Sequence, residues 1–169
     1  GICVDYLNGA PGIYSARYAS TDGHNATDAE NVEKLLKELE NIPDDKRTAR
    51  FMCAMALALP DGVTKTVVGK CEGIITHEIH GEGGFGYDPV FFVKKFGKTF
   101  GEKKKKEKNS VSHRCNAVKL MKKELSEILK NLTYEGEEFI PVDIERKQRY
   151  LEIISSCDQK RIIGVLKTL

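Results

Sequence analysis

The run from residue 81 to residue 93 constrains this chain more than any other stretch. Four of the six residues from 81 to 86 are glycine, and Pro89 then opens an apolar run. Because glycine and proline supply the backbone angles of turns, we predict a loop followed by a short buried strand over residues 89–93. A plain hairpin or bulge would give the same pattern. Phe85 and Tyr87, each next to a glycine, favour instead a loop that presents an aromatic face to a base.

A second stretch places three nitrogen-bearing side chains at the start of a predicted helix. Ser112 is a natural N-cap, and His113 and Arg114 follow it. Cations are disfavoured at this end of the helix dipole, whereas its free N–H groups attract anions, so the pair favours a nearby anionic or electron-rich ligand over a solvated first turn. We predict that Lys108 points into the same space. Asp88 is interpreted as an acceptor for a ring N–H, or alternatively as a turn carboxylate before a proline.

The composition is that of an ordinary globular chain long enough for one domain. Of the 169 residues, 40% are hydrophobic and 31% are charged, and the net charge of +2 does not indicate a protein that coats nucleic acid. The five cysteines are widely spaced without a CxxC pair, which favours free thiols in a reducing cytoplasm. The longest apolar run, residues 51–59, is too short to span a bilayer. We therefore predict a cytoplasmic protein whose partners are neither membranes nor nucleic acids.

Hydrophobic spacing predicts helices that alternate with strands, and hence an α/β fold. Thr27 and Glu30 have the spacing of a capping box at the start of a helix that ends near residue 41. The remaining expected elements are a strand over residues 50–59, a hairpin partner over residues 64–79, and a helix from residue 112 to about 129. Residues 44–47 are interpreted as a surface turn.

Two charged or metal-binding patterns have simpler explanations. Lys103–Lys106 invites a nucleic-acid interpretation, but Glu102 and Glu107 flank the run and four consecutive lysines spread around a helix, so a solvated helix is favoured. His77 and His80 lie three residues apart in a stretch that looks like a strand, so that spacing does not indicate a metal site.

Three segments in order, residues 1–19, 84–89 and 107–114, resemble the inosine/xanthosine triphosphate pyrophosphatase family. The resemblance covers about residues 1–130. It implies an α/β fold with a long, twisted, mixed sheet and flanking helices, a homodimer, and hydrolysis of ITP, dITP and XTP to the monophosphate and pyrophosphate. The substrate-binding residues that it implies are Phe85, Gly86, Tyr87, Asp88, Lys108, His113 and Arg114.

The chain also departs from the pattern of this family. Family members carry a Thr/Ser-Asn-x-x-Lys loop, a magnesium-binding Glu and an acidic pair before the glycine that matches Gly1. The catalytic residues and the ligands of one Mg²⁺ per subunit are therefore expected upstream of Gly1, and Asp5 does not correspond to the catalytic acid. We interpret residues 1–130 as a partial domain and residues 131–169 as an extension of unknown role. The 169 residues alone are expected to be inactive; a catalytically dead nucleotide-binding fragment and a small basic RNA-binding protein are the alternatives.

Overall fold

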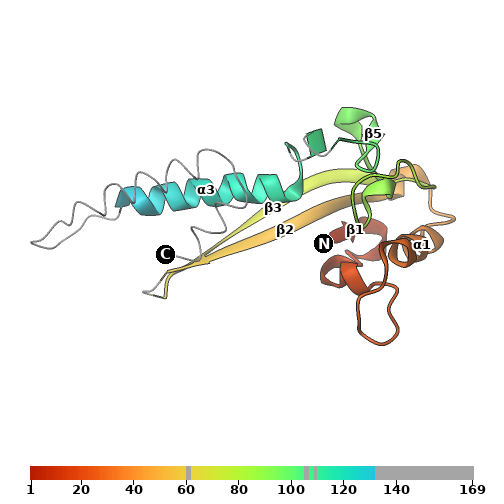
Figure 1. The fold of residues 1–169 in the computed structure, drawn as a ribbon, viewed down its shortest axis with the longest axis horizontal. Helices are drawn as coiled ribbons and strands as arrows, with labels where there is room; N and C mark the ends of the chain where they lie inside the picture. Colours follow the sequence, from red (N-terminus) through yellow and green to blue (C-terminus); the bar gives the residue numbers. More distant parts are fainter. Residues whose placement is uncertain (60–61, 105–106, 109, 132–169) are drawn as a thin grey trace, which may run out of the picture. The chain divides into compact units, whose positions relative to one another are not determined.

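The computed structural model of the protein describes residues 1–59, 62–104, 107–108 and 110–131 (Figure 1). The chain divides into two compact units, Gly1–Cys53 with Lys70–Cys115 and Ala54–Gly69 with Asn116–Leu169, and each is described by itself. The strands are β1 (Ile2–Val4), β2 (Thr48–Ala58), β3 (Thr64–Ile75), β4 (Phe91–Val93) and β5 (Lys98–Thr99). The helices are α1 (Asp28–Glu38) and α3 (His113–Asn131), with 3₁₀ turns at Asp5–Leu7, Gly12–Arg17, Asp44–Lys46, Asp88–Val90 and Lys94–Phe96.

The five strands form one sheet in the order β1-β2-β3-β4-β5, in which β2 and β3 are the long neighbouring ribbons of Figure 1. The pairs β1–β2, β3–β4 and β4–β5 are antiparallel. The predicted α/β fold with flanking helices is confirmed. We expected a mixed sheet, but these described pairs are antiparallel because strands that are consecutive in the chain are also neighbours in the sheet, and each reverses the direction of the one before.

The helix predicted after residue 27 is confirmed, together with its capping box. The Thr27 side chain accepts from the Glu30 N–H, and the Glu30 carboxylate accepts from the Thr27 N–H at 2.8 Å. Val32 and Leu35 lie on the apolar face of α1 and belong to the core cluster of the first unit. This core also contains residues of β1 and β4 and Phe100, so one apolar face of α1 and the sheet bury each other.

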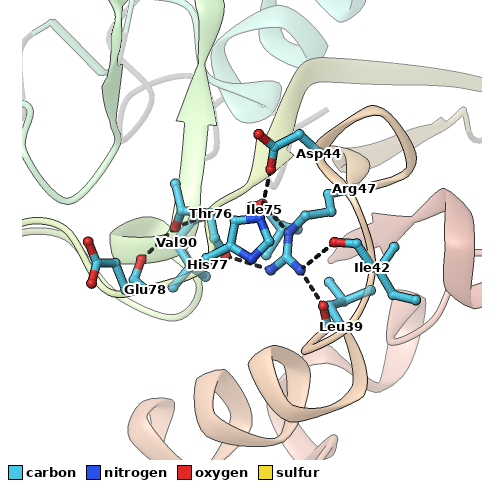
Figure 2. A network of polar contacts seen from close by, with 9 residues as sticks. All are labelled: Leu39, Ile42, Asp44, Arg47, Ile75, Thr76, His77, Glu78 and Val90. Carbon is cyan, nitrogen blue, oxygen red and sulfur yellow. Dashed lines mark hydrogen bonds and ion pairs between the residues drawn. The ribbon is translucent and has the colours of Figure 1, made fainter.

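Arg47 is buried, although the sequence predicts a surface turn over residues 44–47. The turn Asp44–Lys46 is exposed, but Arg47 is only 1% exposed. Its guanidinium donates to the main-chain oxygen of Leu39, to those of Ile75 and Thr76 at 2.8 and 2.7 Å, and to that of Ile42 at 3.3 Å (Figure 2). Arg47 therefore joins the end of α1 to the end of β3, and burial lowers its pKa.

The second unit has a small core of its own. Leu57 of β2 and Met121 and Leu125 of α3 form a buried cluster. The helix predicted from residue 112 is thus confirmed, although Leu120, which we placed on its apolar face, is 44% exposed. Within the described part of the chain, no helix is both long and apolar enough to cross a membrane. The predicted extension over residues 131–169 lies outside the described residues, apart from the last residue of α3.

Candidate functional site

The stretches singled out in the sequence meet at a cavity of about 200 Å³ in the first unit. Its walls come from the start of the chain, the turn Gly12–Arg17, the start of α1, the glycine-rich loop and the start of α3. The lining residues are Gly1, Ile2, Ser15, Ala16, Asp28, Phe51, Phe85, Gly86, Tyr87, Asp88, His113 and Arg114. Six of the seven predicted binding residues are among them.

The glycine-rich loop folds around the carboxylate of Asp88. This carboxylate is 2% exposed, accepts from the Phe85 N–H at 2.9 Å and pairs with the ammonium of Lys108. Gly84 has a φ of 87°, and a Cβ at this position would overlap Asp88. Glycine is therefore required by both the backbone angle and the space. The bond from Asp88 to a ring N–H stays a prediction; in the structure the Oδ2 oxygen of this carboxylate contacts the Phe85 N–H and the Lys108 ammonium.

Phe85 is the exposed ring of the loop. It is 53% exposed, and two cations lie over it: the Lys108 ammonium at 4.3 Å and the Arg114 guanidinium carbon at 4.8 Å from the ring centroid. Such cation–π contacts are favourable and keep positive charge next to the ring. Because the Lys108 ammonium is paired with Asp88, Arg114 supplies the positive charge beside a flat ligand that stacks on Phe85. The side chains of Lys108 and Arg114 both lie over the Phe85 ring, in agreement with the prediction that they point into the same space.

Tyr87 is buried, unlike Phe85. Its ring is 4% exposed, and its hydroxyl donates to the Ser15 main-chain oxygen at 2.8 Å. Burial, followed by the negative charge of Asp28, raises the pKa of Tyr87. The ring thus belongs to the wall of the cavity and to the core, and it offers no free face, unlike the open ring that the flanking glycine suggested.

The start of α3 brings an unsatisfied imidazole to the cavity. The Ser112 side chain accepts from the Cys115 N–H at 3.2 Å, so the predicted N-cap is confirmed. His113 is 5% exposed and stacks on Phe51, with 4.9 Å between ring centroids. Among the described residues, its Nδ1 is the one buried side-chain polar atom without a hydrogen-bond partner. An unsatisfied buried polar atom is costly, so the imidazole lowers the stability of the fold while it lacks a partner.

His113 also makes the stability of the fold depend on pH. Burial, followed by positive charges that include Arg114 and Lys108, lowers the pKa of His113 from 6.5 to about 4. Between these two values the unfolded chain binds more protons at this imidazole than the folded one, so the contribution of His113 to stability falls as pH drops from 6.5 to 4 and is constant outside this window. We expect a loss on the order of 3 kcal/mol. Urea unfolding of the wild type and His113→Gln across this range measures it; parallel curves for the two proteins would contradict a depressed pKa.

Two residues that sequence reasoning missed hold the walls of the cavity in place, and both lie in the first turn of α1. The Asp28 carboxylate accepts from the Gly86 N–H at 2.6 Å. The buried carboxamide of Asn31 accepts from the Ala19 N–H at 2.9 Å and donates to the main-chain oxygens of Ala16, in the turn Gly12–Arg17, and of Ala26, just before α1. In the sequence, Asp28 and Asn31 look like ordinary residues of a helix start. The sequence around Asp28 does not indicate its partner, because Asp28 and Gly86 are 58 residues apart.

The acidic side chains of the described residues do not assemble a metal site. No three His, Cys, Asp or Glu side chains come together in residues 1–59, 62–104, 107–108 and 110–131. Asp5 and Glu72 flank Arg50 at 2.8 and 3.0 Å instead, and Asp5 also accepts from the Thr48 hydroxyl. This donor set therefore does not fit Mg²⁺.

Comparisons with known proteins agree with the motifs. Residues 1–124 match the Ham1 family. A dITP/XTP pyrophosphatase of Listeria monocytogenes serotype 4b (strain F2365) is 50% identical over 133 residues, which are 79% of this chain and 64% of that protein. One from Bacillus licheniformis is 53% identical over 119 residues, or 70% of this chain and 59% of that protein. The chain thus spans less than two thirds of the length of these curated relatives.

Solved structures support the same assignment. The Staphylococcus aureus Ham1 protein matches with a TM-score of 0.69 and 43% identity, over 76% of this chain and 64% of that one. A HAM1 protein from Coxiella burnetii matches with a TM-score of 0.68 and 40% identity, over 75% and 64% of the two chains. The resemblance drawn from the three sequence segments is confirmed: this chain belongs to the Ham1 family.

Proposed function

We propose that the protein hydrolyses non-standard purine nucleoside triphosphates (ITP, dITP and XTP) to the monophosphate and pyrophosphate, and so removes them from the nucleotide pool of the cytoplasm. The observation that carries the proposal is the cavity that the half-exposed Phe85, the imidazole of His113 and the guanidinium of Arg114 line together. The names of its relatives, dITP/XTP pyrophosphatases, support the same activity.

The size of the cavity suits the base of such a substrate. Pockets for whole ligands usually measure about 300–1,000 Å³. A cavity of about 200 Å³ is smaller and fits a purine ring, with the phosphates outside it. Phe85 supplies a stacking face, and stacking contributes about 1–3 kcal/mol per base. Arg114 is exposed, so its guanidinium is free to move to the edge of a stacked base.

Selectivity follows from the group at position 6 of the purine. Hypoxanthine and xanthine carry an oxygen there, which accepts hydrogen bonds, whereas adenine carries an amino donor. Arg114 only donates, so it pairs with the oxo group, whereas adenine offers it no acceptor at this position. His113 is neutral at pH 7 because its pKa is about 4, so it offers one donor and one acceptor without adding charge.

The phosphate chemistry involves groups outside the described site. The Mg²⁺ that the family resemblance implies stays a prediction, with its ligands expected outside this sequence, and the carboxylates described above do not fit it. A bound Mg²⁺ would neutralise charge that develops on the phosphates. The residues of this chain do the other part of the work: they bind the base and orient it. We propose a homodimer as the assembly, on the strength of the same resemblance.

Replacing Arg114 by alanine should reduce selectivity as well as rate. A hydrogen bond with a charged donor contributes about 1.5–3 kcal/mol, so we expect the ratio of kcat/KM for ITP over ATP to fall about tenfold. Steady-state pyrophosphate release from both nucleotides by the full-length protein, with Mg²⁺, measures it. Lys95→Ala removes one positive charge from an exposed position outside the cavity and serves as the control.

The same assay tests the proposed function itself. Pyrophosphate released from ITP and XTP with much higher kcat/KM than from ATP supports it. Equal turnover of all purine nucleotides, or none, contradicts it. If Arg114→Ala slows ITP and ATP by the same factor, Arg114 acts on the phosphates and not on the base.

A further inference from the structure

The backbone on both sides of the Phe85 ring is held by carboxylates from different elements. The Phe85 N–H donates to Asp88 at 2.9 Å, within the loop itself. The next N–H along the chain, that of Gly86, donates to Asp28 of α1 at 2.6 Å. Gly86 has a φ of 59°, in the left-handed region, and a Cβ there would meet no atom within 4 Å. The direction of this N–H therefore depends on the backbone angle and on its acceptor.

A half-exposed ring needs such support to act as a stacking surface. Phe85 is not fixed by burial in the core, because 53% of it faces solvent. Binding a base to a mobile ring would cost the entropy of ordering the ring and its loop, whereas a ring that is already held avoids this cost. One of the two anchors, Asp88, is itself fixed by Lys108. The other is Asp28, which belongs to a helix whose start is closed by its own capping box.

We propose that Asp28 is a positioning residue that fixes the loop at Gly86 and thereby pre-orders the ring of Phe85 for stacking on a purine base. This role rests on the proposed function. Asp28 acts through Phe85 and does not itself select the base, so its loss weakens ITP and ATP binding by the same factor. Its contribution disappears when the ring is absent.

A double-mutant cycle separates this role from the alternatives. Asp28→Ala should raise the Kd for ITP about fivefold, measured by calorimetry on the full-length protein, and should raise KM with little change in kcat. Phe85→Ala should raise Kd about tenfold or more. In the Phe85→Ala background, Asp28→Ala should change Kd less than twofold, because two residues that act through one contact are not additive. Asp28→Asn keeps a side-chain oxygen acceptor and should recover most of the affinity.

Glu30→Ala is the matched control for helix stability. Glu30 lies in the same turn of α1, carries the same charge and closes the capping box, but makes no contact with the loop in the bonds described for it. Its loss should lower Tm at least as much as that of Asp28→Ala while Kd stays within twofold. Amide exchange adds a readout without nucleotide: Asp28→Ala should speed exchange of the Gly86 amide about tenfold and leave the Gly101 amide, which donates to the Asp88 main chain, unchanged.

Three results would overturn the inference while leaving the proposed function standing. An equal loss of affinity in Glu30→Ala would assign the effect to the helix. A fivefold effect of Asp28→Ala that persists without the Phe85 ring, or that differs between ITP and ATP, would assign Asp28 a direct contact with the nucleotide. An unchanged exchange rate at Gly86 would show that the carboxylate does not hold the loop. A wild-type protein that binds no nucleotide contradicts the proposed function, and this inference with it.

Discussion

Replacing Asp88 by alanine should lower the free energy of unfolding by about 3–5 kcal/mol and abolish measurable binding of nucleotide. Asp88 and Lys108 form a buried ion pair, with side chains 2% and 10% exposed. Removing the carboxylate leaves the ammonium buried without its partner, which costs far more than the pair itself contributes. The same change frees the Phe85 N–H, so the loop that carries the ring loses its internal acceptor. Urea denaturation and calorimetric titration with ITP measure the two effects.

The double variant Asp88→Ala/Lys108→Met tests this explanation. With both charges removed, no ammonium is left uncompensated, so most of the lost stability should return. Nucleotide binding should stay weak, because the Phe85 N–H is still without its acceptor and one cation beside the ring is gone. If the single variant Asp88→Ala is as stable as the wild type, the carboxylate has no structural role and the ion pair is not a determinant of the loop.

Arg47→Met should be the most destabilising change away from the cavity, at about 3–4 kcal/mol. Methionine fills a similar volume, but the main-chain oxygens of four residues lose a donor at once (Figure 2). The Leu39 oxygen keeps the Ile42 N–H as a donor, but each buried acceptor left without a partner costs about 1–3 kcal/mol. Relief from burying the charge, which lowers the pKa of Arg47 in the folded state, offsets part of this cost.

Two variants calibrate the Arg47 result. Arg47→Lys keeps the charge but lacks the planar fork that reaches several oxygens, so it should recover less than half of the loss. Lys46→Met changes the exposed neighbour in the same turn and should shift the unfolding midpoint very little. Loss of less than 1 kcal/mol in Arg47→Met would mean that water or a rearranged loop satisfies these oxygens equally well.

The sequence by itself determined what depends on neighbours along the chain. The capping box of α1 joins Thr27 to Glu30, the cap of α3 joins Ser112 to Cys115, and the bend of the loop needs glycine at position 84. Each of these involves residues no more than four apart, so composition and spacing are enough to predict it. The same holds for the family, because the three matching segments are continuous stretches of sequence.

Only the tertiary structure decided which polar groups are partners across the fold. In the folded protein Arg47 is buried next to an exposed turn, the Tyr87 hydroxyl donates to the Ser15 main-chain oxygen, and the Asp28 carboxylate accepts from the Gly86 N–H. Arg47 is 28 and 29 residues from its partners Ile75 and Thr76, Asp28 is 58 residues from Gly86, and Tyr87 is 72 residues from Ser15. Burial, and with it the cost of an unpaired charge or N–H, depends on how separate elements pack. A polar residue at a turn or at a helix start has the same local pattern whether it faces water or holds a binding loop, so its role emerges only when the chain is folded.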